Sequence, residues 1–148
     1  MKRDKPWRKG DLLALPLHGF GFGFARVLDA PLFEFFDFTS LKLEHSANEI
    51  SIKPVLFKIW VSKYARLEGN WRKFGHSQLG LAEYVDPKFF RKDAISGKIY
   101  EYNHATDNSK PLSLEQAKRL ECAAVWDPQH VEERLTAYFQ GTQSIWLR

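Results

Sequence analysis

The residue types that perform most enzyme chemistry are present in this chain, but they are scattered along it. Five histidines occur without any pair at i, i+3 or i+4: His18, His45, His76, His104 and His130. The sequence contains no HExxH or CxxC pattern, no phosphate-cradling P-loop and no GxSxG elbow. We therefore expect no metal and no cofactor, and we predict that the protein is not an enzyme.

A lone cysteine and two nearby acids are the remaining candidates for chemistry. Cys122 with a distant histidine is a known arrangement for nucleophilic catalysis, but its apolar neighbours at 120 and 123–125 favour a core position and an inert thiol. Glu34 and Asp37 fall on opposite faces of a predicted strand and would point apart, which argues against an acid/base pair. An acid among phenylalanines also needs a partner or a route to water.

The elements that carry these residues are predicted to be mostly strands. Residues 20–28 alternate large side chains with glycine, alanine and valine, so one face of the strand is nearly bare. Glycine in a strand marks a bend or a close approach of another backbone. Together with the apolar run at 10–17, this segment predicts the opening hairpin of a small, strongly bent barrel.

Periodicity and turn residues predict the later elements. Further strands are expected at 32–38, at 55–61 and before Gly75, with a long connection over 39–54 and a hairpin turning at 94–97. A capping pattern at Ser113 starts a short helix over 114–119, and residues 120–126 either prolong it or form a strand, which we favour. Asp127 and Pro128 begin a helix over 128–140 that Gly141 ends.

Length and composition bound the class of protein. The chain has 148 residues and 15% aromatic side chains, which favours one mostly-β domain over 10–148. We expect an SH3-like or related strongly bent β-barrel or sheet, with the C-terminal helix packed against it. One cysteine suits a reducing compartment, and no apolar run reaches the roughly 20 residues of a membrane span, so the cytoplasm is the expected location and a membrane is not an expected partner.

The net charge of +4 comes from the amino-terminal tail. Residues 1–9 hold five basic side chains and one acidic one, and the 17 basic and 17 acidic residues of the remainder cancel. Such a tail either contacts nucleic acid or another anionic surface, or is a solvated end, which is the commoner case. Residues 29–49 are acidic and 50–73 basic, which fits neutralisation between facing strands or a bipolar surface that orients a partner.

Several of these segments, in this order, resemble the immunity protein 26 family of bacterial polymorphic toxin systems. The matching features are Lys9-Gly10-Asp11 before Leu15-Pro16, the strand Gly21–Leu28, Phe35-Phe36-Asp37, the strand at 55–61, Trp71 four residues before Gly75, Glu121, Ala124-Val125-Trp126, His130-Val131 and Arg134-Leu135. The resemblance implies a mostly-β cytoplasmic protein that binds and neutralises a cognate toxin domain by stoichiometric inhibition, as in contact-dependent inhibition.

The resemblance directs attention to surface residues rather than to a catalytic centre. If the acidic stretch faces outward, Glu34, Asp37 and Glu44 would contact basic groups on the toxin. Trp71, followed by Arg72, is a candidate anchor for the partner, or else a tryptophan that closes one end of the barrel. The body is neutral, whereas many immunity proteins are acidic, so a purely electrostatic plug for a nuclease is not the expected mechanism.

Two other functions compete with toxin binding. A small nucleic-acid-binding β-barrel module would hold phosphates with the basic tail, Arg72 and Lys73, and its affinity would fall steeply with salt. Few cations surround the aromatic strands, so nucleic acid is not the expected partner. An enzyme using Cys122 is the third alternative, and an unreactive thiol in the folded protein would count against it.

Overall fold

The computed structural model describes residues 6–19, 21–67, 69–83, 87–102, 109–142 and 144. The chain divides into two compact units, the first made of residues 1–82 with 125–148 and the second of 83–124. The sequence instead predicts a single domain over 10–148 after a tail of residues 1–9. Residues 1–5 of the basic tail, Phe20 and His104 are outside the described residues.

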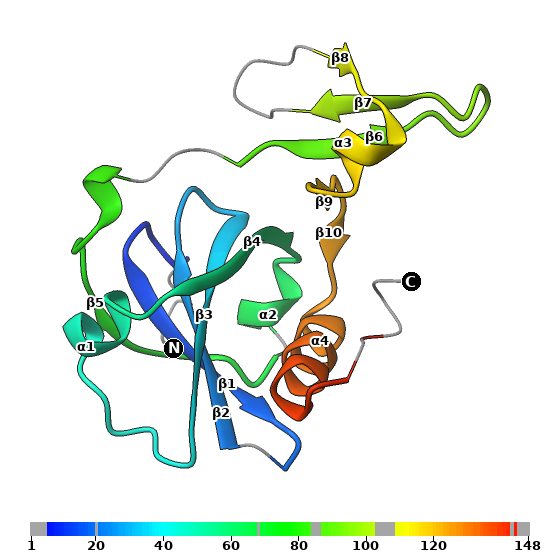
Figure 1. The fold of residues 1–148 in the computed structure, drawn as a ribbon. Coiled ribbons are helices and arrows are strands. Elements are labelled where there is room, and N and C mark those ends of the chain that lie inside the picture. Colours follow the sequence, from blue (N-terminus) through cyan, green and yellow to red (C-terminus); the bar gives the residue numbers. More distant parts are fainter. Residues whose placement is uncertain are drawn as a thin grey trace. The chain divides into compact units, whose positions relative to one another are not determined.

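The first unit is built around a six-stranded sheet with the order β10-β4-β3-β2-β1-β5 (Figure 1). Its strands are β1 (Asp11–Leu17), β2 (Gly21–Val27), β3 (Leu32–Ser40), β4 (Val55–Val61), β5 (Arg72–His76) and β10 (Val125–Trp126). Neighbours pair antiparallel except β10, which runs parallel to β4. The predicted mostly-β class is confirmed; among the described residues the strands form open sheets rather than a closed barrel.

The sheet of the first unit is buried on both faces, as the aromatic alternation of β3 predicts. Phe33 and Phe35 join one hydrophobic cluster, and Phe36 joins a second on the other face. The first cluster, around Phe35, also contains Trp71, Val131 and Leu135; the second, around Phe24, contains Leu12, Ala14, Phe36 and Ile50, with Phe22, Phe38 and Phe74 packed against it. Each fully buried phenylalanine contributes roughly 1.5–3 kcal/mol.

Helix α4 (Pro128–Gln140) covers the face of the Phe35 cluster, and its ends are those that the sequence predicts. The Asp127 side chain accepts a hydrogen bond from the backbone N–H of Gln129 at the amino end. At the other end Gly141 adopts a left-handed conformation. The stripe of Val131 and Leu135 is fully buried. Trp7 also packs here, edge-on to Phe33, so the tail is tied to the core from that residue onward.

Two short helices connect strands of the first unit, α1 (Ala47–Ser51) and α2 (Tyr64–Leu67), and the 3-10 turn η1 (Leu81–Glu83) follows β5. The sequence predicts a connection over 39–54, whereas β3 runs on to Ser40 and α1 follows. Ser46 caps α1 by accepting the Glu49 N–H, and Ile50 is buried in the Phe24 cluster. A five-residue helix is too short to show a periodic apolar stripe.

The second unit has its own four-stranded sheet with the order β8-β7-β6-β9. Its elements are β6 (Phe89–Lys92), β7 (Ile99–Tyr102), β8 (Ser109–Pro111), α3 (Leu114–Ala117) and β9 (Glu121–Cys122). The predicted hairpin is confirmed, with Gly97 at a positive φ of 72°. Ser113 and Gln116 form the predicted capping box. Residues 120–126 are not helical and contribute β9 and β10.

Gly21 shows why the glycine-rich strand has a bare face. Its φ is 75°, and a Cβ here would overlap the Ser40 carbonyl and lie 2.8 Å from the Leu41 Cα. Gly19, at a φ of 79°, has nothing within 4 Å of the same position. Close packing at Gly21 therefore holds the end of β3 and the start of the following segment against β2.

We expect Gly21→Ala to lower the free energy of unfolding by about 2–3 kcal/mol, because it adds a backbone clash to the left-handed strain. Gly19→Ala is the matched control and adds only the conformational strain, about 1 kcal/mol. Urea denaturation measures both. Equal losses in the two variants would show that the approach of Ser40 to β2 is not tight.

Candidate interaction surface

Glu34 lies in the interior and pairs with Arg26 of the neighbouring strand. The Arg26 Nε donates to Glu34 Oε1 at 2.7 Å, the Nη2 lies 2.7 Å from the same oxygen, and both side chains are about 95% buried. The Arg26 Nη1 donates to the carbonyl of Leu79 at 2.7 Å. This is the partner that an acid among phenylalanines requires, and it keeps the Glu34 carboxylate off the surface.

Trp71 is also interior. It is only 5% exposed and packs edge-on to Phe33 and Phe35. Its Nε1 donates to Glu132 of α4 at 3.1 Å. Burial raises the pKa of Glu132, and the Trp71 hydrogen bond partly opposes that rise. Trp71 therefore anchors α4 and offers a partner almost no surface.

The other three predicted contact residues are exposed, but they do not gather in one place. Asp37 accepts a hydrogen bond from the Tyr138 hydroxyl of α4 at 3.1 Å, on the face of the Phe35 cluster. Glu44 follows Leu43, which lines a hollow on the face of the Phe24 cluster, and Arg72 lines the same hollow. The structure thus places Arg72 at the hollow, with Glu44 next to the lining residue Leu43 in the chain, and leaves Asp37 on the other side of the sheet.

The hollow near Glu44 and Arg72 is the best candidate for a protein-binding surface. It has a volume of about 370 Å³ and is lined by Ala14, Pro16, Phe22, Leu43, Asn70 and Arg72. Leu43 is 42% exposed and Leu41, two residues earlier, is 82% exposed. We call Pro16, Phe22, Leu41, Leu43, Glu44 and Arg72 the Leu43 surface. Exposed aliphatic side chains beside a concave apolar site are typical of interaction sites.

The segment that carries Leu41 and Leu43 is held firmly although it has no regular structure. His45 packs edge-on to Phe24 and Phe38, with ring centroids 5.5 and 5.4 Å apart. Its Nε2 lies 2.9 Å from Ser40 Oγ, which also accepts the Lys42 N–H. Because the backbone is fixed at both ends, the two leucines are presented to a partner with little ordering cost.

Two leucines in the sequence indicate this surface, although they belong to none of the predicted strands. Leu41 and Leu43 are the two aliphatic residues near the start of a stretch predicted as a polar connection. An aliphatic residue in a connection belongs either to a nearby core or to a partner. Only the fold shows that these two leucines stay exposed while His45 and Ile50 fill the core below them.

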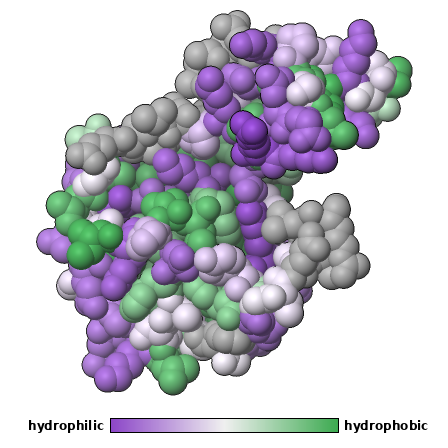
Figure 2. Space-filling model, in the orientation of Figure 1, coloured by the Kyte–Doolittle hydropathy of each residue, from purple (hydrophilic) through white to green (hydrophobic). Residues whose placement is uncertain are grey.

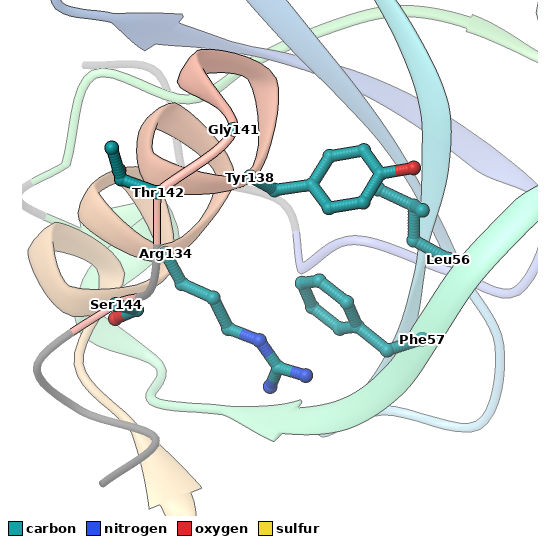
Figure 3. A pocket seen from close by; sticks show the side chains of 7 residues that line it. All are labelled: Leu56, Phe57, Arg134, Tyr138, Gly141, Thr142 and Ser144. Atoms are coloured by element: carbon teal, nitrogen blue, oxygen red, sulfur yellow. The ribbon is translucent and has the colours of Figure 1, made fainter.

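A second hollow lies between β4 and the end of α4 (Figure 3). It is lined by Leu56, Phe57, Arg134, Tyr138, Gly141, Thr142 and Ser144 and has a volume of about 520 Å³. The Arg134 side chain is mostly buried, and its Cζ lies 3.7 Å from the centre of the Phe57 ring and 5.0 Å from that of Trp126.

Figure 2 shows hydrophobic side chains along β4 and beside α1. Val55 and Ile52 are the exposed aliphatic residues there.

Asp11 is a buried carboxylate that ties the tail to β5. It accepts the Arg8 N–H at 2.9 Å, lies 2.9 Å from His76 Nδ1 and is paired with Lys73 at 3.2 Å. Burial acts to raise the pKa of Asp11, but the hydrogen bonds from Arg8, His76 and Lys73 outweigh it and leave the pKa below its usual range. The cluster contains an acid and a base, and Ser77, which follows His76 in the chain, donates its hydroxyl hydrogen to Asn48 at 2.7 Å.

The lowered pKa of Asp11 predicts how stability depends on pH. A carboxylate with a lower pKa in the folded state stabilises the fold above its unfolded pKa, and this contribution is lost as pH falls through the folded pKa. We expect Asp11→Asn to cost about 1–3 kcal/mol at pH 7, and the difference from wild type to shrink below about pH 4. Thermal unfolding across pH measures this, with the exposed Asp29→Asn as control; a difference that persists unchanged at low pH would exclude the ionised carboxylate as its source.

The position predicted for Cys122 is wrong. The sequence places it in the core, but the thiol is exposed, because residues 121–122 form a two-residue strand at the edge of the second sheet, beside β6. Partial burial and the Glu121 charge raise its pKa, so little thiolate is present at neutral pH. Its exposure makes it accessible, while its raised pKa makes it a poor nucleophile.

Within the described parts of the chain, no three His, Cys, Asp or Glu side chains are grouped so as to hold a metal ion. The helices found in the described ranges are all too short or too polar to span a bilayer. Phe24 is fully buried and Phe22 is partly buried against the core, so β2 offers little surface on which bases could stack.

A model of immunity protein 26 matches residues 8–120, about three quarters of the chain. This chain belongs to the immunity protein 26 family. The match contains the whole Leu43 surface and ends before α4, so the features quoted above from Glu121 onward lie beyond it. No curated protein and no solved structure matches the chain.

Proposed function

We propose that this protein protects the cell that makes it by binding a cognate toxin domain and blocking the toxin's activity. Membership of the immunity protein 26 family is the observation that carries this proposal. The protein acts in the cytoplasm by forming a stoichiometric complex, and its function lies in occupying a surface of the toxin rather than in transforming a substrate.

The distribution of polar groups supports binding over catalysis. The ionisable side chains that come together do so in structural pairs, such as Arg26 with Glu34 and Asp11 with Lys73. The Leu43 surface instead combines a fixed backbone, a shallow apolar hollow and an arginine, the features by which proteins recognise one another. We assign toxin contacts to Glu44 and Arg72 at this surface and keep Asp37 as a separate candidate on the opposite face.

Co-expression tests the proposed function. We expect a toxin gene beside this one, and the carboxyl-terminal domain of its product is induced in a bacterial host with and without this protein. We expect growth arrest when the toxin domain is expressed alone, normal growth when both are present, and a one-to-one complex on gel filtration. Growth arrest despite full expression of this protein, with no complex formed, would contradict the proposal.

A further inference from the structure

Arg72 gives the hollow of the Leu43 surface a positive charge. Of the described residues that line the hollow, it alone is charged. It lies on β5 opposite Ala14 of β1, and its side chain is exposed. Within the parts of the chain that the structure describes, no carboxylate is paired with it.

The charges near Arg72 leave its own charge uncompensated. Lys73, its neighbour on β5, is already paired with the buried Asp11 at 3.2 Å. Lys42 and Glu44 flank Leu43 in the chain and cancel each other. A guanidinium beside an apolar hollow is complementary to a carboxylate next to an apolar side chain, because its planar N–H groups bind both carboxylate oxygens.

We propose that the toxin docks on the Leu43 surface by placing an apolar side chain in the hollow and an aspartate or glutamate against Arg72. This proposal rests on the proposed function and adds the chemistry of the partner. The part of the toxin that faces the hollow and Arg72 is therefore apolar and acidic. It differs from the basic groove with which a nuclease holds phosphates, so inhibition does not depend on imitating nucleic acid.

Charge reversal tests this assignment. The affinity of the adjacent-gene toxin domain is measured by calorimetry for wild type, Arg72→Glu and Arg119→Glu. Arg119 is an exposed arginine of the second unit, so its reversal changes the net charge equally. We expect Arg72→Glu to weaken binding about tenfold or more and Arg119→Glu to change it less than about twofold. Unchanged melting temperatures exclude misfolding.

The apolar part of the contact has its own matched pair. Leu43→Asp places a charge in the hollow, whereas Ile95→Asp places one at a position that is 98% exposed in the turn between β6 and β7. We expect the first to weaken toxin binding at least about tenfold and the second to leave it unchanged. Equal effects of the two substitutions would contradict docking at Leu43.

Charge reversals in the toxin domain identify the sign of the charge that faces Arg72. Each exposed acidic residue of the toxin domain is changed to lysine and tested against Arg72→Glu. We expect one such reversal to restore binding to the Arg72→Glu protein and to weaken binding to wild type. Tighter binding of the unmodified toxin by Arg72→Glu would overturn the proposal, because it would show a basic partner surface.

The remaining outcomes separate this inference from the proposed function. If wild type does not bind the toxin domain at all, the proposed function itself fails. If wild type binds and all four variants bind equally well, toxin binding stands and the Leu43 surface is excluded. Arg72→Glu could instead leave toxin binding intact and abolish binding to an RNA oligonucleotide, or abolish self-association in sedimentation. Either result would show that the surface belongs to another partner and would overturn the assignment to the toxin.

Discussion

Glu34→Ala is expected to destabilise the protein by about 3–5 kcal/mol and to leave little folded protein at 37 °C. Among the residues that the structure describes, Glu34 is the one carboxylate paired with Arg26, so the substitution leaves an unpaired guanidinium that is about 96% buried beside Phe36. The cost of an unpaired buried charge greatly exceeds that of a lost surface contact. Chemical denaturation followed by tryptophan fluorescence measures the loss.

Two further variants separate an unpaired charge from lost packing. The double variant Arg26→Met with Glu34→Leu replaces both ions by apolar groups of similar volume. We expect its free energy of unfolding to lie within about 2 kcal/mol of the wild-type value. Glu44→Ala removes an exposed acid and should cost less than about 0.5 kcal/mol. If the double variant is as unstable as Glu34→Ala alone, the ion pair is not the source of the effect.

Phe24→Ala is expected to cost about 3–5 kcal/mol and, in addition, to weaken toxin binding. Phe24 is fully buried, and its ring contacts Phe38, Phe74 and His45 at centroid distances of 5.5–5.8 Å. Removing it creates a cavity under His45, the residue that holds the segment of Leu41 and Leu43. A loosened segment must be ordered again when the toxin binds, so the affinity falls.

Phe35→Ala is the matched control for Phe24→Ala. Phe35 is equally buried but belongs to the cluster on the other face, where it contacts Phe57 and Trp71. We expect a similar loss of stability with the toxin affinity of the folded protein unchanged, when both are measured at a temperature where each variant is folded. Equal weakening of binding by both substitutions would mean that the binding surface is not confined to the Phe24 face.

The strands and α4 could be predicted because their signals are local. Aromatic residues alternate along β3 between two buried faces, and Asp127, Pro128 and Gly141 mark the ends of α4 directly. The sequence also predicts that Glu34 needs a buried partner, because burying an unpaired charge is costly. That the partner is Arg26 follows from the register, which places Arg26 opposite Glu34.

The surface could be predicted only in part, because exposure depends on contacts between distant segments. Cys122 has apolar neighbours in sequence, but a two-residue edge strand cannot bury them. Arg72 and Lys73 follow Trp71 in the sequence, but the Trp71 side chain is buried in the core while Arg72 is exposed. Leu41 and Leu43 are exposed because Gly21 and His45 fix the backbone beneath them, which no local pattern specifies.

Titration of the toxin's activity against increasing amounts of this protein tests the central claim most directly. An inhibitor that acts by occupying its target leaves a residual activity that falls linearly and ends at one equivalent when both proteins are well above the Kd. We expect wild type to give that endpoint. With Arg72→Glu, we expect the residual toxin activity to fall gradually and to need a higher concentration of the variant. Full activity at a large excess of wild type would contradict binding, and inactivation by far less than one equivalent would show a catalytic mechanism instead.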